Sequence, residues 1–141
     1  MKRLTIIIFS VLLLITLFTG CSSKLTSSEK QVPDLTGEWK QLNSNSEDSY
    51  QAATISDDTI EIYWVSDNGD TKSLYWAGSF IAPTTADKSF TWDSKNDHSK
   101  TDSAMLASQD DTKTMTYQNG VLSYEVSIMG TTTKVKLEKQ K

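Results

Sequence analysis

The sequence predicts an all-β domain in residues 34–141, built as a single antiparallel meander of eight or nine strands that closes into a small barrel. The segment is rich in Thr, Ser, Val, Ile, Trp and Tyr, several of which favour pleated, half-buried strands. It has no extended apolar pattern with a helical period, and its turn signals recur at short intervals. Closing a meander into a barrel also removes its exposed edges.

Residues 1–20 have the layout of an export signal. Lys2 and Arg3 form a positive start, residues 4–18 are apolar, and two small residues follow. The alternatives to a lipoprotein signal are an ordinary secretory signal peptide and an uncleaved anchor. The apolar run is short for an anchor, since a spanning helix needs about 20 apolar residues.

Cys21 is the only cysteine of the chain and directly follows this segment. The sequence Phe-Thr-Gly-Cys at positions 18–21 resembles the lipobox of bacterial lipoproteins, although Phe18 stands where that family usually has leucine. The resemblance implies that the Cys21 thiol receives a diacylglycerol and becomes the mature N-terminus, because a thiolate is nucleophilic enough to be alkylated. Two or three acyl chains would anchor the protein stably to a membrane.

Residues 21–33 are expected to be the lipidated cysteine and a flexible tether, because positions 22–33 are polar and rich in serine. The tether would hold the domain just off the bilayer, and the 34–141 segment is long enough for one compact core. Without the two basic residues of the signal, 12 basic residues remain against 18 acidic ones, so the mature net charge is −6. This balance opposes binding to nucleic acid, which requires a basic surface.

Each strand of the domain is predicted from a run of β-forming residues bounded by turn residues. Ala104 to Ser108 is included as a short apolar run. The predicted strands are 38–42, 51–55, 59–65, 72–81, 89–93, 104–108, 112–118, 121–129 and 132–138.

The strongest hairpin signal is Asn119-Gly120, because both central positions of a type I′ turn need positive φ. It places Tyr117 opposite Leu122 on an apolar face and Thr116 opposite Ser123 on a polar one. A second turn at Gly130-Thr131 would pair Val126 with Val135 and Glu125 with Lys136.

The loop of the hairpin spanning 59–81 is ambiguous, since Asp67-Asn68-Gly69-Asp70 permits loops of two or three residues. A one-residue change of register moves every side chain to the other face. The three-residue loop is preferred because it collects the apolar side chains on one face. That face would hold Ile60, Ile62, Trp64, Leu74, Trp76 and Phe80, and the other face Tyr63, Val65 and Tyr75.

Gly37-Glu38-Trp39 on the first predicted strand resembles the Gly-x-Trp motif of lipocalin-like barrels, and Thr101-Asp102-Ser103 resembles a second lipocalin signature more faintly. The resemblance implies a barrel of that class in which Trp39 closes one end. The arginine that packs on this tryptophan in the family has no counterpart, since Arg3 is the only arginine.

No catalytic constellation, metal site or cofactor is predicted. His98 is the only histidine and falls in the polar stretch 93–98, which is typical of a solvated loop. The 67–70 segment has oxygen ligands beside a glycine but lacks the spacing of an EF-hand, so a plain turn is preferred to a calcium loop.

The aromatic residues give the remaining candidates for a site. The simplest interpretation is that they fill the core, and the functional one is an apolar pocket in the barrel mouth. Tyr63 and Tyr75, on the opposite face, are the candidate partner patch. The candidate pocket residues are Trp39, Ile62, Trp64, Trp76 and Phe80.

We therefore expect a non-enzymatic, membrane-anchored extracytoplasmic lipoprotein that binds a small apolar ligand or an envelope component. The alternative is an interaction lipoprotein, such as an inhibitor of a basic lytic enzyme or an exclusion or immunity factor of a mobile element. An envelope hydrolase would need a histidine or carboxylate pair that the sequence does not show. The scarcity of arginine favours a Gram-positive host, and hence the outer face of its cytoplasmic membrane.

Overall fold

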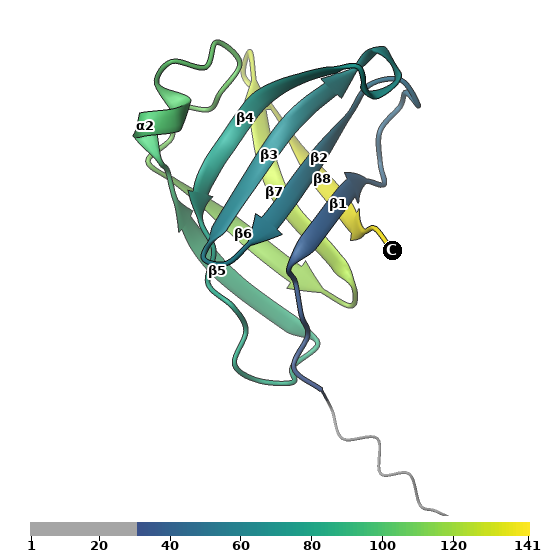
Figure 1. Cartoon of the computed structure of the whole chain (residues 1–141), viewed down its shortest axis with the longest axis vertical. Coiled ribbons are helices and arrows are strands. Elements are labelled where there is room, and N and C mark those ends of the chain that lie inside the picture. The colour runs from purple at the N-terminus through teal and green to yellow at the C-terminus, as the bar shows by residue number, and fades with distance from the viewer. Residues whose placement is uncertain (1–30) are drawn as a thin grey trace, which may run out of the picture.

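The computed structural model describes residues 31–141, in which each strand pairs with the next along the chain except the fourth with the fifth. These residues form one antiparallel sheet of eight strands, in the order β4-β3-β2-β1-β8-β7-β6-β5, curled into a barrel-like shape (Figure 1). The predicted all-β meander is confirmed. The expected signal peptide of residues 1–20 and the lipidated Cys21 lie outside the described residues.

The elements follow one another closely along the chain, so most connections are short turns. Apart from the strands, the described residues hold a 3-10 turn, η1, and a single-turn helix, α2. The elements are β1 (Gly37–Gln41), β2 (Tyr50–Ser56), β3 (Thr59–Ser66), η1 (Asp67–Gly69), β4 (Thr71–Ser79), β5 (Ser89–Lys95), α2 (His98–Thr101), β6 (Thr112–Gln118), β7 (Val121–Ile128) and β8 (Thr131–Lys139).

The first and last strands pair side by side, with Trp39 opposite Lys139. The other closure, between β4 and β5, is sparse and consists of a bridge between Gly78 and Asn96 with a few hydrogen bonds beside it. The amide of Asp97 donates to the carbonyl of Ala77 over 2.8 Å, and the amide of Lys95 donates to Ser79 Oγ over 2.9 Å. This β4–β5 seam completes the circuit of strands.

The core fills the inside of the curled sheet, because alternate residues of each strand point inward. Trp76 and Ile62 are fully buried, and the Trp76 indole N–H donates to Ser94 Oγ over 2.9 Å. At the end of the barrel away from the α2–β6 loop, Trp39 packs edge-on against Tyr117 with ring centroids 6.5 Å apart. Its indole N–H donates to the carbonyl of Leu35 over 2.9 Å.

The predicted strand 104–108 is wrong, and this segment belongs to the loop that joins α2 to β6. Its backbone makes local turns, in which the amide of Ala104 bonds the carbonyl of Thr101 and the amide of Ala107 bonds that of Ala104. Met105 is 97 % exposed, so the short apolar run is not inserted into the core. The amide of Ser108 reaches the carbonyl of Tyr75 over 2.8 Å and ties the loop to β4.

The hairpin at Asn119-Gly120 is confirmed. Both residues have positive φ, 51° and 89°, and Tyr117 faces Leu122 as expected. The next turn is wrong by one position. Met129 and Gly130 take positive φ, 51° and 80°, so the loop begins at the methionine.

This choice of turn shifts the β7–β8 register by two residues. Val126 therefore faces Thr133, and Glu125 faces Lys134 in place of the expected Lys136. An even shift leaves the inward face unchanged, so Val126 and Val135 are still buried. The opposite charges of Glu125 and Lys134 still meet across the strands.

The β3–β4 hairpin also differs from the prediction. Ser66 pairs with Thr71 around a four-residue loop, and the register shifts between Ile62 and Tyr63. Tyr63 pairs with Leu74 and Ile62 with Trp76, so Tyr75 is an extra, bulged residue. Because of the bulge, Trp76 shares the inward face with Ile62, although the four-residue loop alone would have turned Trp76 outward.

Candidate functional site

The predicted pocket residues separate into two groups in the structure. Trp39, Ile62, Trp76 and Phe80 are at most 5 % exposed and form part of the packed core. Trp64, at the end of the interior near η1, is only partly buried. The structure thus brings one of the five to a pocket surface and gives the others a packing role.

The pocket that Trp64 lines lies at one end of the barrel and has a volume of about 550 Å³. Its walls come from β3, β4, the end of β7 and the α2–β6 loop. We call it the mouth pocket. It is lined by Trp64, Tyr75, Leu106, Ala107, Ser108, Gln109, Asp110, Ser127 and Ile128.

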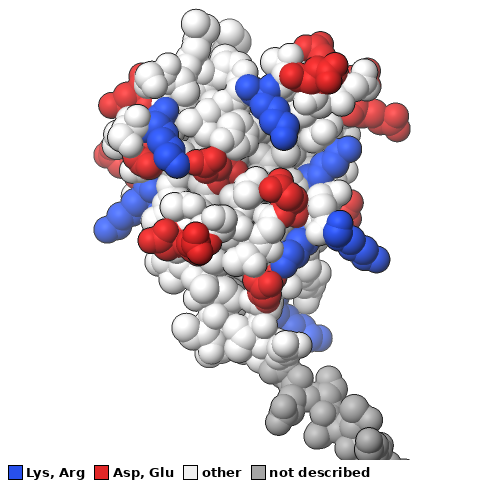
Figure 2. Space-filling view, viewed as in Figure 1, with Lys and Arg blue, Asp and Glu red and all other residues white. Residues whose placement is uncertain are grey.

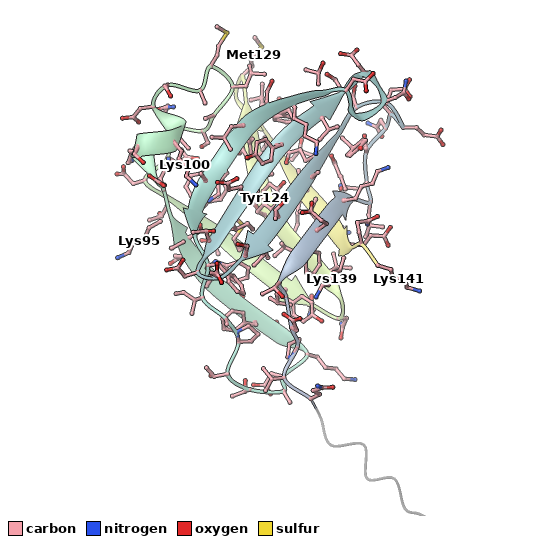
Figure 3. All side chains as sticks on the ribbon, viewed as in Figure 1. Lys95, Lys100, Tyr124, Met129, Lys139 and Lys141 are labelled. Carbon is pink, nitrogen blue, oxygen red and sulfur yellow. The ribbon has the colours of Figure 1, made fainter. Side chains whose placement is uncertain are left out.

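The α2–β6 loop and the β7–β8 turn meet at this end of the barrel, whereas residues 31–36 enter at the opposite end (Figure 1). Met129 marks the rim in Figure 3, and Tyr124 lies deeper, in the middle of the barrel. Four apolar side chains of the rim are exposed, with Met105 and Met129 at 97 % and 101 % and Leu106 and Ile128 at 54 % and 52 %. The mouth pocket is therefore edged by solvent-exposed apolar groups.

Tyr75 is the residue that the sequence placed on the wrong face. As the bulged residue of β4 it points inward, is 6 % exposed and belongs to the core. Tyr63 stays outside, so the structure does not bring the two tyrosines together as a partner patch. Tyr75 takes the inward place expected for Leu74, which is partly buried on the outer surface beside the α2–β6 loop.

Three aromatic rings form a continuous wall from the mouth pocket into the core. Trp64 packs edge-on against Tyr75 with centroids 5.4 Å apart, and Tyr75 stacks on Tyr124 with centroids 6.4 Å apart. Such edge-on and stacked pairs are favourable arrangements of the ring quadrupoles. The wall is therefore preorganised.

A buried polar pair lies behind this wall. The Tyr124 hydroxyl donates a hydrogen bond to Oε1 of Gln51, a side chain that faces inward on β2 opposite Trp64. Burial raises the pKa of the Tyr124 hydroxyl well above its usual value. Nε2 of Gln51 is buried and has no hydrogen-bond partner among the described residues. The interior near the mouth therefore contains a free amide donor.

We expect the Gln51 and Tyr124 side chains to depend strongly on each other. Replacing either, by Gln51→Met or Tyr124→Phe, leaves buried polar groups unsatisfied and should lower the free energy of unfolding by about 1–3 kcal/mol. The double variant should lose clearly less than the sum of the two. Denaturant unfolding of all four proteins measures the coupling, and additivity within about 0.5 kcal/mol would contradict it.

His98 fastens the two ends of the loop that walls the mouth pocket. It is the first residue of α2, not part of an irregular loop. Its Nδ1 lies 2.9 Å from Oδ1 of Asp102, which follows α2, and its Nε2 lies 3.3 Å from Oδ1 of Asp111, which precedes β6. The hydrogen bonds to Asp102 and Asp111 raise the pKa of the His98 ring. Both ring nitrogens are engaged, so the arrangement braces the loop.

We expect this brace to make stability depend on pH. Because the pKa of His98 is raised in the folded protein, its contribution is fully present below the unfolded value of about 6.5 and is lost as pH rises through the folded value. His98→Asn should therefore lower Tm relative to the parent at pH about 5.5, and the difference should shrink toward pH about 8.5. Thermal unfolding across this range tests it, and a constant difference would show that His98 acts by packing alone.

A hydrogen-bonded network on the outer face connects β3 to α2. The Tyr63 hydroxyl donates to Oε2 of Glu61 over 2.6 Å, and Lys100 Nζ lies 2.6 Å from Oε1 of the same carboxylate. The bond to Glu61 raises the pKa of Tyr63 to about 12, and the bond from Lys100 lowers the pKa of Glu61. The Glu61 carboxylate therefore links β3 to α2.

Two further findings concern residues 31–141 alone. No group of three or more His, Cys, Asp or Glu side chains lies together in that range with the geometry to hold a metal ion. None of the helices in the same range has the length and apolar character needed to span a membrane.

Three residues near the site were not predicted from the sequence, namely Lys113, Gln51 and Tyr124. The strand pattern contained the signal for Lys113. It alternates with Met115 and Tyr117 on the inward face of β6, which places a lysine among apolar residues. For Gln51, the same alternation with Ala53 and Ile55 was the available signal.

Together, the fold and the mouth pocket define a small antiparallel, barrel-like protein with an aromatic cavity at one end. No protein family, curated protein or solved structure matches this chain.

Proposed function

We propose that this protein is a lipid-anchored extracytoplasmic binding protein that holds a small apolar molecule at the barrel mouth. The mouth pocket carries the proposal, since its volume of about 550 Å³ falls within the range of small-molecule sites. Trp64, Tyr75, Leu106 and Ile128 supply an apolar lining, and Ser108 and Gln109 supply polar groups. Because the Trp64, Tyr75 and Tyr124 rings pack against one another, ligand binding would require little further ordering of this wall.

The anchoring part of the proposal rests on the sequence of residues 1–21. A Cys21 lipid would hold the protein at the outer face of the membrane, and the chain would enter the barrel at the end opposite the mouth (Figure 1). The mouth would then be accessible from the extracytoplasmic space. Radiolabelled palmitate incorporation that is lost in Cys21→Ser would support lipidation, and its retention would refute it.

Native mass spectrometry of the full-length protein, released from membranes in a styrene–maleic acid copolymer without added detergent, tests the binding function. A discrete non-covalent mass that disappears on unfolding is the expected result. Trp64→Ala should weaken its retention, and Tyr63→Phe, on the outer face, is the matched control. A bare mass that remains bare when single-chain lipids are offered would refute the proposal.

One observation favours a second function, the interaction lipoprotein. The exposed rim residues Met105 and Met129 are adaptable apolar contacts of the kind found at binding surfaces. On the face seen in Figure 2, by contrast, lysines and acidic residues are interspersed, so that face offers no single-sign patch to a basic enzyme. Met105→Asp with Met129→Asp should abolish capture of a protein partner and leave the mass adduct of a small ligand in place.

A further inference from the structure

The wall of the barrel has an opening between β6 and β7. Their pairing runs from the turn only as far as Thr116 opposite Ser123, although both strands continue beyond it. On their other sides, β6 pairs with β5 up to Thr112 and β7 pairs with β8 up to Ile128. Residues 112–115 and 124–127 therefore face each other across a gap, which holds a pocket of about 420 Å³. We call it the lateral slot.

Lys113 extends into the lateral slot from the inward face of β6. It is 7 % exposed, and no other lysine is buried in the described part of the chain. Its Nζ lies over the rings of Tyr75 and Trp76, 5.3 Å and 5.2 Å from their centroids. Aromatic faces attract a cation but do not neutralise it.

The charge of Lys113 is balanced from the solvent side alone. Nζ lies 3.2 Å from Oδ2 of Asp110 and 3.4 Å from the carbonyl of Glu125. Asp110 belongs to the α2–β6 loop, and its side chain is 66 % exposed. A buried ammonium requires a well-placed anion, and here the anion comes from an exposed loop residue that a ligand carboxylate or phosphate could replace.

The lateral slot and the mouth pocket are adjacent. Both are lined by Asp110 and Ser127. Tyr75 connects them, since its ring lines the mouth pocket and also lies beneath Lys113 Nζ. An anionic group bound at Lys113 and an apolar chain lying along Trp64 could therefore belong to one molecule.

We propose that the site binds an anionic single-chain amphiphile, whose carboxylate or phosphate pairs with Lys113 in the lateral slot and whose alkyl chain occupies the mouth pocket. This inference rests on the proposed function and specifies its ligand class. Thr112 lines the slot and offers a hydroxyl donor to the head group, whereas the Thr114 hydroxyl already donates to Oδ1 of Asp93. Asp110 competes with the ligand for the same ammonium.

The test uses full-length protein in phosphatidylcholine vesicles and three photoreactive probes of equal chain length. The probes are dodecanoate, dodecyl phosphate and dodecanol, each with a diazirine on the chain, and labelled peptides are identified by mass spectrometry. An anionic probe should label the mouth peptides about tenfold more than the alcohol, as expected for a charged hydrogen bond. Comparison of the two anions distinguishes a carboxylate from a phosphate ligand.

Lys113→Met should remove the preference for the anionic probes and reduce their labelling to the level of the alcohol. Lys113→Arg retains the charge and should retain the preference, provided thermal unfolding shows both variants to be folded. Lys88→Met is the matched control, since Lys88 is an exposed lysine that lines neither the lateral slot nor the mouth pocket. Asp110→Asn should increase anionic labelling several-fold, because it removes the competing carboxylate.

Each outcome separates this inference from the proposed function. Equal labelling by the acid and the alcohol, or a preference that persists in Lys113→Met, would overturn the role of Lys113 and leave apolar binding at the mouth intact. Absence of mouth labelling by all three probes would overturn both.

Discussion

Replacing Trp76 with alanine is expected to lower the free energy of unfolding by about 3–5 kcal/mol, the range for removing a large aromatic side chain from a core. Trp76 is fully buried and belongs to the hydrophobic core. Its loss leaves a cavity, removes the hydrogen bond to Ser94 Oγ and withdraws one of the rings beneath Lys113. In a domain of this size, Tm should fall by at least about 12 °C.

Trp64→Ala is the matched control for this variant. It also removes an inward-facing indole, but Trp64 is only partly buried, at the mouth. We expect its effect on stability to be clearly smaller, below about 2 kcal/mol, because less area is withdrawn from water. Denaturant unfolding compares the two variants. Equal losses would mean that the mouth is packed as tightly as the core.

Replacing Gly78 with valine is expected to destabilise the protein by at least about 3 kcal/mol, the upper end of the range for overpacking. A Cβ at this position would lie 2.5 Å from Ser94 Oγ and 2.6 Å from the carbonyl oxygen of Lys95. The backbone carbonyl cannot rotate away, so the two strands must separate. Because Gly78 makes the bridge to Asn96, the change should open the β4–β5 seam.

Hydrogen exchange of the Asp97 amide, which bonds the carbonyl of Ala77 at the seam, measures this opening directly. Faster exchange there, with less change in β7–β8, is the expected pattern for Gly78→Ala, the milder variant. Gly120→Asn serves as control, because a Cβ there meets no neighbour and asparagine tolerates positive φ. Unchanged seam exchange in Gly78→Ala would show that the strands accommodate a methyl group.

The fold class was predictable because it depends on features that extend over many residues. Strand-forming composition and closely spaced turns define a meander without any knowledge of long-range contacts. The prediction of a strand at 104–108 failed for a tertiary reason, not a local one. Met105-Leu106 has the composition of a strand, but the seam draws β4 and β5 together and leaves this segment outside the sheet as a cover for the mouth.

The register errors have a common cause, which is that turn geometry was inferred from residue type. Asn119-Gly120 matched its type and was predicted correctly. Met129 adopts positive φ although methionine rarely does, and nothing in the local sequence indicates it. At β3–β4 the bulge at Tyr75 compensates for a longer loop, and a bulge is set by the packing of both faces.

The composition of the candidate site could not be predicted from the sequence. Of the five residues expected to line an apolar pocket, Trp64 alone lines the mouth pocket. The other expected members were chosen as large apolar side chains, and such residues fill a core unless topology leaves an opening. Lys113 was missed because a lysine on a strand is normally exposed, and its burial depends on the gap between β6 and β7.

The unequal burial of the tryptophans also makes the protein its own optical probe. Trp39, Trp76 and Trp92 are at most 4 % exposed, so Trp64 is the indole in residues 31–141 that meets solvent appreciably. Its emission should be the reddest and the most accessible to iodide quenching, and Trp64→Phe should remove that component while leaving the rest unchanged. Ligand binding in the mouth pocket would then be detected as a shift in the fluorescence emission of Trp64, without any attached label.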